Sequence, residues 1–459
     1  MSQPAIFDAV RRALAEGNFD GALQLLGDPA EAEAFNLAGL ALGGLRRFDE
    51  AAAALTTALS LAPARFDLMS NLGSALVELD RFGDALALFR QAHALAPRNA
   101  RIIANIGNLL DFAGALDDAI LAYETAHVLA PSDAEIGRNR SMALLRAGRL
   151  AEGWPLFEHR RRAVDPAEAT VPRLGDLATL AGKRVLLFHE QGFGDTLQML
   201  RYAPLLAERG ADVLVRVPKP LARLAAAVPG VHAVVGEGEA TGPLDFQAPL
   251  MSLPLIFGTE LGSIPAAMPY LAADPAAAAV WAERLSNLPR PWVGLVWAGS
   301  PTGGLDHRRS MRFADLAPIL QAPAGFISLQ IGPGATDWAP PAGAATLDAT
   351  PWIGDFADTA ALVSQLDLLI TVDTAVAHLA GGLGRPVWVL DRFSSCWRWL
   401  TGRTDSPWYP SLRLLRQPAP GQWQQPVAEA VRLLNSPSPP IGGRGPGCGG
   451  LGRNVPTSS

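Results

Sequence analysis

The sequence of 459 residues predicts a helical repeat solenoid (an α-solenoid) followed by an α/β region with two parallel sheets. Three observations lead to this prediction. A pattern of small and large apolar residues returns at a constant interval in the first third of the chain. Short apolar strands then alternate with amphipathic helices. A stretch rich in Pro and Ala, 264–291, separates those strands into two sets.

Ala-Pro pairs close three successive units, with equally spaced prolines at Pro63, Pro97 and Pro131. In each unit a glycine, two alanines and a large apolar residue between the alanines stand at the same distances before the proline. The small residues let two antiparallel helices approach closely, and the large residue fills the groove to the next unit. Proline ends the second helix because it lacks a backbone donor. This spacing is typical of tetratricopeptide (TPR) repeats and favours them over an ordinary helical bundle.

The clear repeats are 32–65, 66–99 and 100–133, and less regular units flank them at 6–28 and 134–162. Terminal repeats commonly differ because one side faces solvent. The expected organisation is a TPR region (1–163), a connector (164–180), two Rossmann-like domains facing a cleft (181–275 and 276–435) and a disordered tail rich in Pro, Gly and Ser (436–459). We expect the last helix at Trp423–Leu434.

Composition narrows the function classes. The chain has 38 Lys+Arg against 44 Asp+Glu, and this net charge of -6 argues against nucleic acid as the main partner. Two cysteines, Cys396 and Cys448, form neither a disulfide framework nor a zinc motif. We find no signal-peptide pattern and no apolar run of the ~20 residues that a membrane span needs. We therefore expect a soluble cytoplasmic protein, which can still act at the inner face of a membrane.

The first candidate site motif is EQGFGDTL, Glu190–Leu197, between a strand at 184–189 and a helix at about 195–208. The carboxyl end of such a strand is where open α/β sheets bind ligands. Gly192 and Gly194 permit close backbone approach, and Asp195 lies near the helix N-terminus. The alternative is that Asp195 only caps this helix. This motif lacks the dinucleotide fingerprint GxGxxG, which argues against an oxidoreductase.

The second motif, Thr371–Gly384, again has the order strand, turn, helix. Asp373 and Thr374 fall at the turn, where helix amides favour a diphosphate. His378 follows one turn later, and a purely structural histidine is an equal alternative.

The third motif is the basic loop 306–312. Its arginines, Arg308, Arg309 and Arg312, can neutralise a leaving phosphate, because guanidinium groups match that geometry. A solvated loop is the alternative.

Together, the segments HEQGFGDTLQMLRYAPLLAERGA, VGLVWAGSP, RRSM and DFADTAALVSQLDLLITVDTAVAHLAGGLGRPVWVL resemble bacterial TPR glycosyltransferases. Their transferase part is similar to the ADP-heptose:lipopolysaccharide heptosyltransferases of glycosyltransferase family 9. The resemblance covers nearly all of residues 30–435. It implies a GT-B fold, with the acceptor bound mainly by the first Rossmann-like domain and the nucleotide-sugar donor by the second. It also implies an inverting transfer that needs no metal or other cofactor.

The resemblance implies that Asp195 is the general base and that Arg309 is a cation for the donor phosphates. The other expected donor-binding residues are Gly192, Gly194, Ser300, Asp373, Thr374 and His378. The chain differs from the family pattern at Gly303–Leu305, at Ala375 and at Cys396. We expect an enzyme that moves a sugar from a nucleotide-sugar to a protein or glycan acceptor held partly by the repeats. The alternative is a non-catalytic TPR scaffold with a degenerate transferase-like region.

Overall fold

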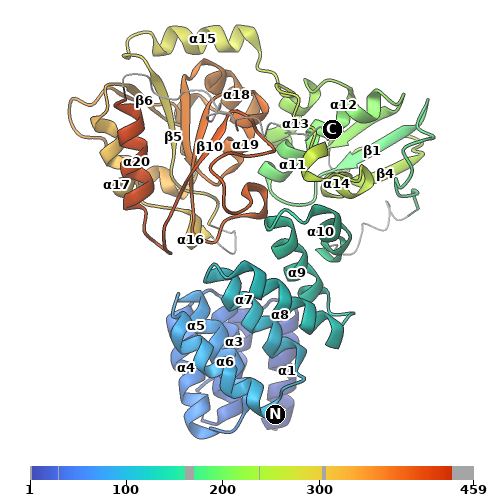
Figure 1. The fold of residues 1–459 in the computed structure, drawn as a ribbon, viewed down its shortest axis with the longest axis vertical. Coiled ribbons are helices and arrows are strands. Elements are labelled where there is room, and N and C mark those ends of the chain that lie inside the picture. Colours follow the sequence, from blue (N-terminus) through green and yellow to red (C-terminus); the bar gives the residue numbers. More distant parts are fainter. Residues whose placement is uncertain (1–2, 29, 161–169, 237, 302–305, 437–459) are drawn as a thin grey trace, which may run out of the picture. The chain divides into compact units, whose positions relative to one another are not determined.

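A computed structural model of the chain describes residues 3–28, 30–160, 170–236, 238–301 and 306–436. The chain divides into two compact units, Met1–Arg162 and Ala163–Ser459 (Figure 1). Most of the expected tail and part of the expected connector lie outside the described residues. No helix within the described ranges is both long and apolar enough to cross a bilayer.

The first unit is a helical repeat solenoid, as predicted. Consecutive helices pack in pairs, and each pair also packs against the next. Its described helices are α1 (Gln3–Ala15), α2 (Phe19–Leu26), α3 (Ala32–Gly44), α4 (Phe48–Leu61), α5 (Phe66–Glu78), α6 (Phe82–Leu95), α7 (Ala100–Phe112), α8 (Leu116–Leu129), α9 (Ala134–Arg146) and α10 (Leu150–Phe157). The irregular flanking units form the pairs α1–α2 and α9–α10, so they keep the repeat architecture.

The small-and-large residue pattern explains the close approach within each pair. A Cβ atom added to Gly73 on α5 would lie 2.6 Å from Cε1 of Phe89 on α6. The equivalent atom on Gly107 would lie 2.8 Å from Cε1 of Tyr123. Phe89 and Tyr123 are buried, so their rings occupy the space that each glycine leaves. Glycine is therefore required by packing at this repeat position.

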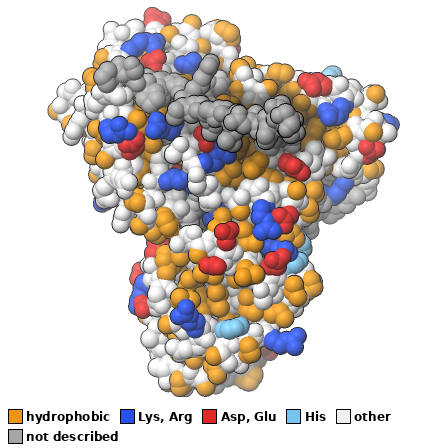
Figure 2. Space-filling model, viewed as in Figure 1, with side chains coloured by type: hydrophobic (Ala, Val, Ile, Leu, Met, Phe, Trp, Pro, Cys, Tyr) orange, Lys and Arg blue, Asp and Glu red, His pale blue; other side chains and the backbone are white. Residues whose placement is uncertain are grey.

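Large apolar side chains remain exposed on the second helices of the repeats. Leu61, Leu95, Leu121 and Val128 keep between 54% and 75% of their surface accessible. Figure 2 shows hydrophobic side chains gathered over the repeat helices on the face in view. Exposed apolar surface of this kind is available for contact with another macromolecule.

The second unit begins with a four-stranded parallel sheet in the order β3-β2-β1-β4. Its strands are β1 (Arg184–Phe188), β2 (Asp212–Arg216), β3 (Val231–Val235) and β4 (Phe246–Pro249). The end of the expected connector pairs with the β4 edge, because the Leu174 N–H donates to the Gln247 carbonyl at 2.8 Å. The helices here are α13 (Lys219–Ala226) and α14 (Leu253–Ile256), besides those that follow β1.

The helix that the sequence predicts at about 195–208 is interrupted. It forms α11 (Phe193–Met199), a 3₁₀ turn at Leu200–Tyr202 and α12 (Ala203–Ala207). Pro204 has no N–H to donate to the carbonyl four positions earlier, which favours an interruption of the α-helix at this point. The prediction of one long helix was wrong in this respect.

The second sheet has six parallel strands in the order β10-β9-β8-β5-β6-β7. Its strands are β5 (Trp292–Val296), β6 (Gly325–Ser328), β7 (Thr346–Asp348), β8 (Leu368–Val372), β9 (Val387–Asp391) and β10 (Leu412–Arg416). Its α-helices are α15 (Pro275–Leu285), α16 (Asp306–Arg309), α17 (Phe313–Leu316), α18 (Phe356–Gln365), α19 (Ala375–Gly382) and α20 (Gln424–Leu434). Two parallel sheets were predicted and are confirmed, whereas β7 and β10 were not foreseen.

The strand orders show where ligands can bind. From β5 the chain adds β6 and β7 on one side, and β8, β9 and β10 on the other. In the first sheet β1 lies between β2 and β4. Strand order reverses at these points, and open α/β sheets bind ligands there, at the carboxyl ends of the strands. The three motifs of the sequence follow β1, β5 and β8.

Candidate functional site

Asp195 lies in the first turn of α11, directly after β1. Its Oδ2 accepts a hydrogen bond of 2.9 Å from the Gly192 N–H, so the carboxylate does cap the helix. Its Oδ1 forms an ion pair with Nη2 of Arg398. The two side chains are only 15% and 13% exposed, so this pair is largely shielded from water. Asp195 therefore has a structural role in addition to any chemical one.

Arg398 comes from the segment that follows β9, in a 3₁₀ turn at Trp397–Trp399. Its Nε donates to Gln198 Oε1 at 3.0 Å, and its Nη1 donates to Cys396 Sγ at 2.9 Å. Burial lowers the pKa of Arg398 to about 10, so the side chain stays charged at neutral pH. In the sequence this segment stood out only for Cys396, and no pattern pointed to Arg398.

His378 brings the first and second motifs into contact. A Cβ atom on Gly194 of α11 would lie 2.7 Å from Cδ2 of His378 on α19, so only glycine fits. His378 Nδ1 and the Tyr409 hydroxyl are 2.9 Å apart, and the imidazole stacks on Trp399 with ring centroids 5.1 Å apart. Burial lowers the pKa of His378 to about 4, so the ring is neutral at pH 7. This environment fits the structural alternative for the histidine.

A buried arginine, Arg201, reinforces the same α11–α19 contact. Its Nη1 donates to the carbonyls of Pro265 and Trp408 at 3.0 and 2.8 Å. Its guanidinium also lies 4.7–5.2 Å from the ring centroids of Tyr270, Trp408 and Tyr409. Carbonyl oxygens and aromatic faces thus stabilise the charge of Arg201, which is only 3% exposed to water. No sequence pattern pointed to this role, because Arg201 is an isolated cation in a largely apolar segment.

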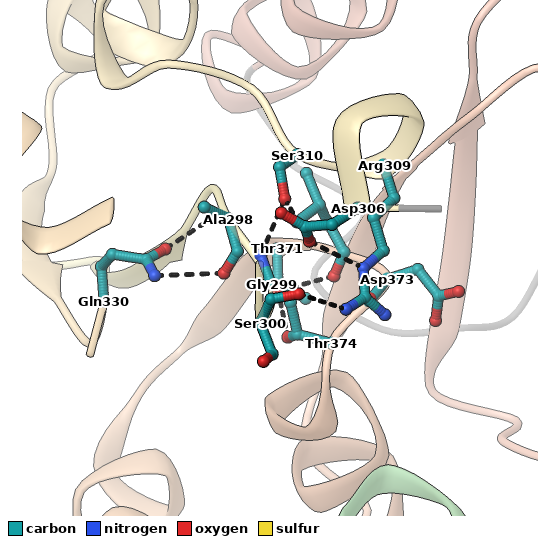
Figure 3. A network of polar contacts seen from close by, with 11 residues as sticks. Ala298, Gly299, Ser300, Asp306, Arg309, Ser310, Gln330, Thr371, Asp373 and Thr374 are labelled. Atoms are coloured by element: carbon teal, nitrogen blue, oxygen red, sulfur yellow. Dashed lines mark hydrogen bonds and ion pairs between the residues drawn. The ribbon is translucent and has the colours of Figure 1, made fainter. Parts of the chain in front are cut away.

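Arg309 lies between the carboxyl ends of β5 and β8 (Figure 3). Its Nη2 reaches the Ser300 carbonyl and its Nη1 the Asp373 carbonyl, each at the long distance of 3.5 Å. Its Nε contacts Asp306 Oδ1 at 3.1 Å. No dashed line in Figure 3 ends on the Asp373 carboxylate. The guanidinium is thus held over the switch point of the second sheet by weak contacts and one ion pair.

The loop after β5 is fixed by side-chain hydrogen bonds. Gln330 Oε1 accepts from the N–H groups of Trp297 and Ala298 at 2.9 and 2.8 Å. The Gly299 N–H donates to Ser310 Oγ at 2.9 Å, and Ser310 Oγ donates to Asp306 Oδ1 at 2.8 Å (Figure 3). These bonds hold the loop that presents the Ser300 carbonyl to Arg309.

The N-terminus of α19 is not capped by its own side chain. Thr374 is the N-cap residue, but its hydroxyl lies 2.9 Å from the hydroxyl of Thr371 and makes no cap hydrogen bond. The N–H groups of Ala375 and Val376 in the first turn have no intrahelical acceptor. Such amides, with the helix dipole behind them, attract anionic groups such as phosphate.

The structure arranges the predicted site residues in two groups. Gly192, Gly194, Asp195 and His378 meet where α11 packs on α19. Ser300, Arg309, Asp373 and Thr374 lie at the carboxyl ends of β5 and β8. Of the other loop arginines, Arg312 is 78% exposed and pairs with Asp315, as a solvated loop would require. Gly303–Leu305 lie outside the described residues.

No cluster of three or more His, Cys, Asp or Glu side chains suited to a metal ion occurs within the described ranges.

The repeat unit carries a second candidate site, a polar hollow of about 280 Å³. It is lined by α5, α7 and α9, which contribute Asn71, Asn105 and Asn139 at equivalent positions of successive repeats. Their amides bond from repeat to repeat, for example from Asn71 Nδ2 to Asn36 Oδ1 at 2.8 Å. A side-chain amide both donates and accepts, so this row can bind a polypeptide main chain or sugar hydroxyls. The regular asparagine spacing was present in the sequence but was not recognised there.

Comparison with known proteins supports the repeats. The profile of the tetratricopeptide repeat matches residues 32–65. Protein FlbA of Caulobacter vibrioides (strain ATCC 19089 / CIP 103742 / CB 15) is 28% identical over 333 residues, covering 64% of this chain and 54% of FlbA. The chain thus spans about half the length of this curated relative. The matched stretch is longer than the repeat unit, so it includes part of the α/β unit.

Solved structures similar to the chain are repeat proteins. A thermophilic TPR protein from Thermus thermophilus is 21% identical, with a TM-score of 0.33, and the match covers 34% of this chain and 89% of that one. MamA from Desulfovibrio magneticus RS-1 is 23% identical, with a TM-score of 0.28, covering 34% and 89%.

Proposed function

We propose that the chain is a GT-B glycosyltransferase that transfers a sugar from a nucleotide-sugar to an acceptor held partly by its repeats. One observation carries the proposal: the helix that follows β1 packs directly on the helix that follows β8. This contact brings the carboxylate of Asp195 and the uncapped first turn of α19 to the same interface. A base on one side and an anion-binding turn on the other are the two elements that sugar transfer requires. The motif resemblance of both segments supports the same assignment.

In the proposed reaction, an acceptor hydroxyl attacks the anomeric carbon from the face opposite the diphosphate. Its proton passes to Asp195, which acts as general base. The bond from the anomeric carbon to the diphosphate oxygen breaks, and its electron pair stays on that oxygen. Arg309 and the first amides of α19 stabilise the negative charge that develops there. Attack opposite the leaving group inverts the anomeric configuration, and the charge stabilisation comes from protein groups without a metal.

Arg398 imposes a condition on this mechanism. Its ion pair with Asp195 means that an acceptor hydroxyl must compete with a guanidinium for the same carboxylate. Acceptor binding therefore has to separate Asp195 from Arg398, or the acceptor hydroxyl has to use carboxylate lone pairs that Arg398 leaves accessible. We assign Arg398 as a positioning residue, because its contacts with Gln198 and Cys396 orient it toward Asp195.

The repeat unit is proposed to hold the acceptor. The row formed by Asn71, Asn105 and Asn139 offers donors and acceptors at a regular interval, which suits an extended polypeptide or a glycan. The proposed location is the cytoplasm, including the inner face of a membrane, because nucleotide-sugars are made in the cytoplasm.

The test measures release of nucleoside diphosphate from a panel of nucleotide-sugars by the full-length chain. Asp195→Asn alone is ambiguous, because it leaves the buried Arg398 unpaired and costs about 3–5 kcal/mol of stability. The double variant Asp195→Asn with Arg398→Met removes both charges and separates the two effects. We expect it to recover the thermal stability lost by D195N while turnover stays at least a hundredfold below wild type. Turnover in the double variant equal to wild type would refute Asp195 as the base.

A non-catalytic scaffold is the second candidate, and the burial of Asp195 favours it. Both carboxylate oxygens are engaged, and the side chain is 15% exposed. A scaffold would show no release of nucleoside diphosphate from any nucleotide-sugar, even with the acceptor bound to the repeats. Binding of a nucleotide-sugar alone does not decide between the two, because a degenerate enzyme can retain it.

A further inference from the structure

Arg392, which follows β9 directly, is a buried cation without a hydrogen-bonded partner among the described residues. It is 9% exposed, and its Nε and Nη1 atoms are buried and lack an acceptor there. No carboxylate in the described ranges forms an ion pair with it. Leaving a buried guanidinium unpaired costs several kcal/mol, so a protein retains one only where something else offsets the cost.

The neighbouring acidic residue does not satisfy Arg392. Asp391 Oδ2 is occupied by Arg416 Nη1 at 3.2 Å and by the Ser395 hydroxyl at 2.6 Å. Arg416 also donates from Nη2 to the Trp399 carbonyl at 2.8 Å. Asp391 and Arg416 therefore form a structural pair through Oδ2, while Asp391 Oδ1 makes no hydrogen bond among the described residues. Arg392 acts on Asp391 only through its charge.

The strand register places Arg392 at the α19 end of the site. Val372 of β8 pairs with Leu390 of β9. Thr374 lies two residues after Val372, and Arg392 lies two residues after Leu390. Thr374 and Arg392 therefore follow the carboxyl ends of two adjacent strands, at the same edge of the sheet. Thr374 is the N-cap of α19, whose first amides have no side-chain cap. The charges of Arg392 and Asp373 both act on the Cys396 thiol, which places these three residues in one neighbourhood.

The first cation of the site is already partly neutralised. Arg309 contacts Asp306 through Nε, and its two 3.5 Å contacts are to carbonyl oxygens. A nucleoside diphosphate carries more negative charge than this compensated arginine offsets. A second cation with unused donors would offset the remaining charge of the diphosphate. A guanidinium group suits this role because it can donate two parallel hydrogen bonds to phosphate oxygens.

We propose that Arg392 is a second anion-binding residue of the nucleotide site and that the diphosphate of the donor supplies the partner its guanidinium lacks. This assignment rests on the proposed function for the identity of the ligand. The arginine is specific to diphosphate binding, so its loss should weaken nucleotide binding without weakening the fold.

The test compares thermal unfolding and calorimetric binding of inorganic pyrophosphate, ADP and UDP by the full chain. Arg392→Met removes the charge and keeps an unbranched apolar side chain in place of the aliphatic part of arginine. We expect it to melt at or above the wild-type temperature without ligand and to bind the favoured diphosphate about tenfold to hundredfold more weakly. Arg392→Lys should recover part of that affinity, because it restores a cation.

Two further variants serve as matched controls. Arg416→Met at the same sheet edge breaks the pair with buried Asp391 and should lower the melting temperature. Arg432→Met on α20, where the side chain is 66% exposed and pairs with Glu429, should change neither readout.

Each outcome decides between the two proposals. If R392M lowers the melting temperature and leaves diphosphate affinity intact, Arg392 is structural and the inference is overturned. If wild type and R392M bind ADP or UDP equally well, and the additional variant Arg309→Met loses that binding, the inference again fails while the proposed function stands. If wild type binds pyrophosphate through Arg392 but no nucleoside diphosphate, the anion site stands and the proposed function fails. Binding of none of the three probes by wild type overturns the inference as well.

Discussion

Lowering the pH from 6.5 to 4 should act on the α/β unit through two buried groups that oppose each other. Burial lowers the pKa of His378 to about 4, with the charge of Arg201 acting in the same direction. Burial raises the pKa of Asp391 to about 6, although Arg416 and Ser395 contact its carboxylate. Both side chains are at most 3% exposed, so solvent screening does not erase these shifts.

The signs follow from which state binds the proton first. The unfolded chain protonates His378 near pH 6.5 and the folded chain only near 4, so falling pH removes stability across that window. Asp391 is protonated in the folded chain near pH 6 but in the unfolded chain only near 3.8, so falling pH adds stability. At about 1.4 kcal/mol per pH unit, each shift is worth about 3 kcal/mol. In the wild type the two contributions nearly cancel between pH 6 and 4.

Single substitutions should expose each contribution. Asp391→Asn leaves the His378 contribution alone, so the variant should lose about 3 kcal/mol between pH 6.5 and 4 relative to wild type. His378→Gln leaves the Asp391 contribution alone and should gain about as much over the same window. Each variant is compared with its own stability at pH 7, so the fixed cost of altered packing cancels.

Urea unfolding followed by tryptophan fluorescence measures these changes in the α/β unit, because all but one of the 11 tryptophans, Trp154, lie beyond the repeats. His232→Gln is the histidine control, since its side chain is 69% exposed and pairs only at the surface. Its pH profile should run parallel to that of the wild type. If D391N and H378Q also gave profiles parallel to the wild type, the assignment of both shifted groups would be wrong.

Three further predictions concern packing and binding. Gly73→Ala should lower the free energy of unfolding of the repeat unit by about 1–3 kcal/mol, because its Cβ would lie 2.6 Å from Phe89. Gly43→Ala, whose Cβ meets nothing within 4 Å, should raise that free energy by up to about 1 kcal/mol. Unfolding followed by circular dichroism measures both. Arg201→Met should cost the α/β unit about 3 kcal/mol in urea, because the carbonyls of Pro265 and Trp408 lose their donor; an unchanged midpoint would contradict this role. Changing Asn71, Asn105 and Asn139 together to Ala should raise KM for the acceptor about tenfold with kcat retained. Thr57→Ala on α4, outside the polar hollow, should change neither value.

The repeats were predictable from sequence because their packing is local. Each glycine meets a large side chain of the same unit, and the separation from Gly73 to Phe89 equals that from Gly107 to Tyr123. A fixed spacing therefore encodes the contact. Strand β10 was harder, since its short sequence Leu412–Arg416 follows a segment without a clear helix and joins the sheet at its edge, beside β9. The break near Pro204 was predictable in principle, because proline removes a backbone donor and so disfavours a continuous helix.

The site was only partly predictable, for a physical reason. Motif position located Asp195 and the α19 turn because each directly follows a strand, whereas Arg309, in the loop beyond β5, was located by the resemblance of its motif. Arg201 and Arg398 escaped notice because their partners are distant in sequence: Arg201 bonds the carbonyl of Trp408, and Arg398 pairs with Asp195. No local pattern encodes such contacts, and only the folded chain brings them together.

The buried arginines of the α/β unit differ in how their charge is balanced, and this difference separates structure from function. Arg201 is satisfied by three carbonyls and three aromatic rings. Arg398 has Asp195, Gln198 and Cys396, and Arg416 has Asp391. A fold that supplies partners to three guanidinium groups in one region is able to supply them to a fourth. That Arg392 has none among the described residues is therefore best explained by a ligand, because the cost of the unpaired charge is recovered only when an anion binds.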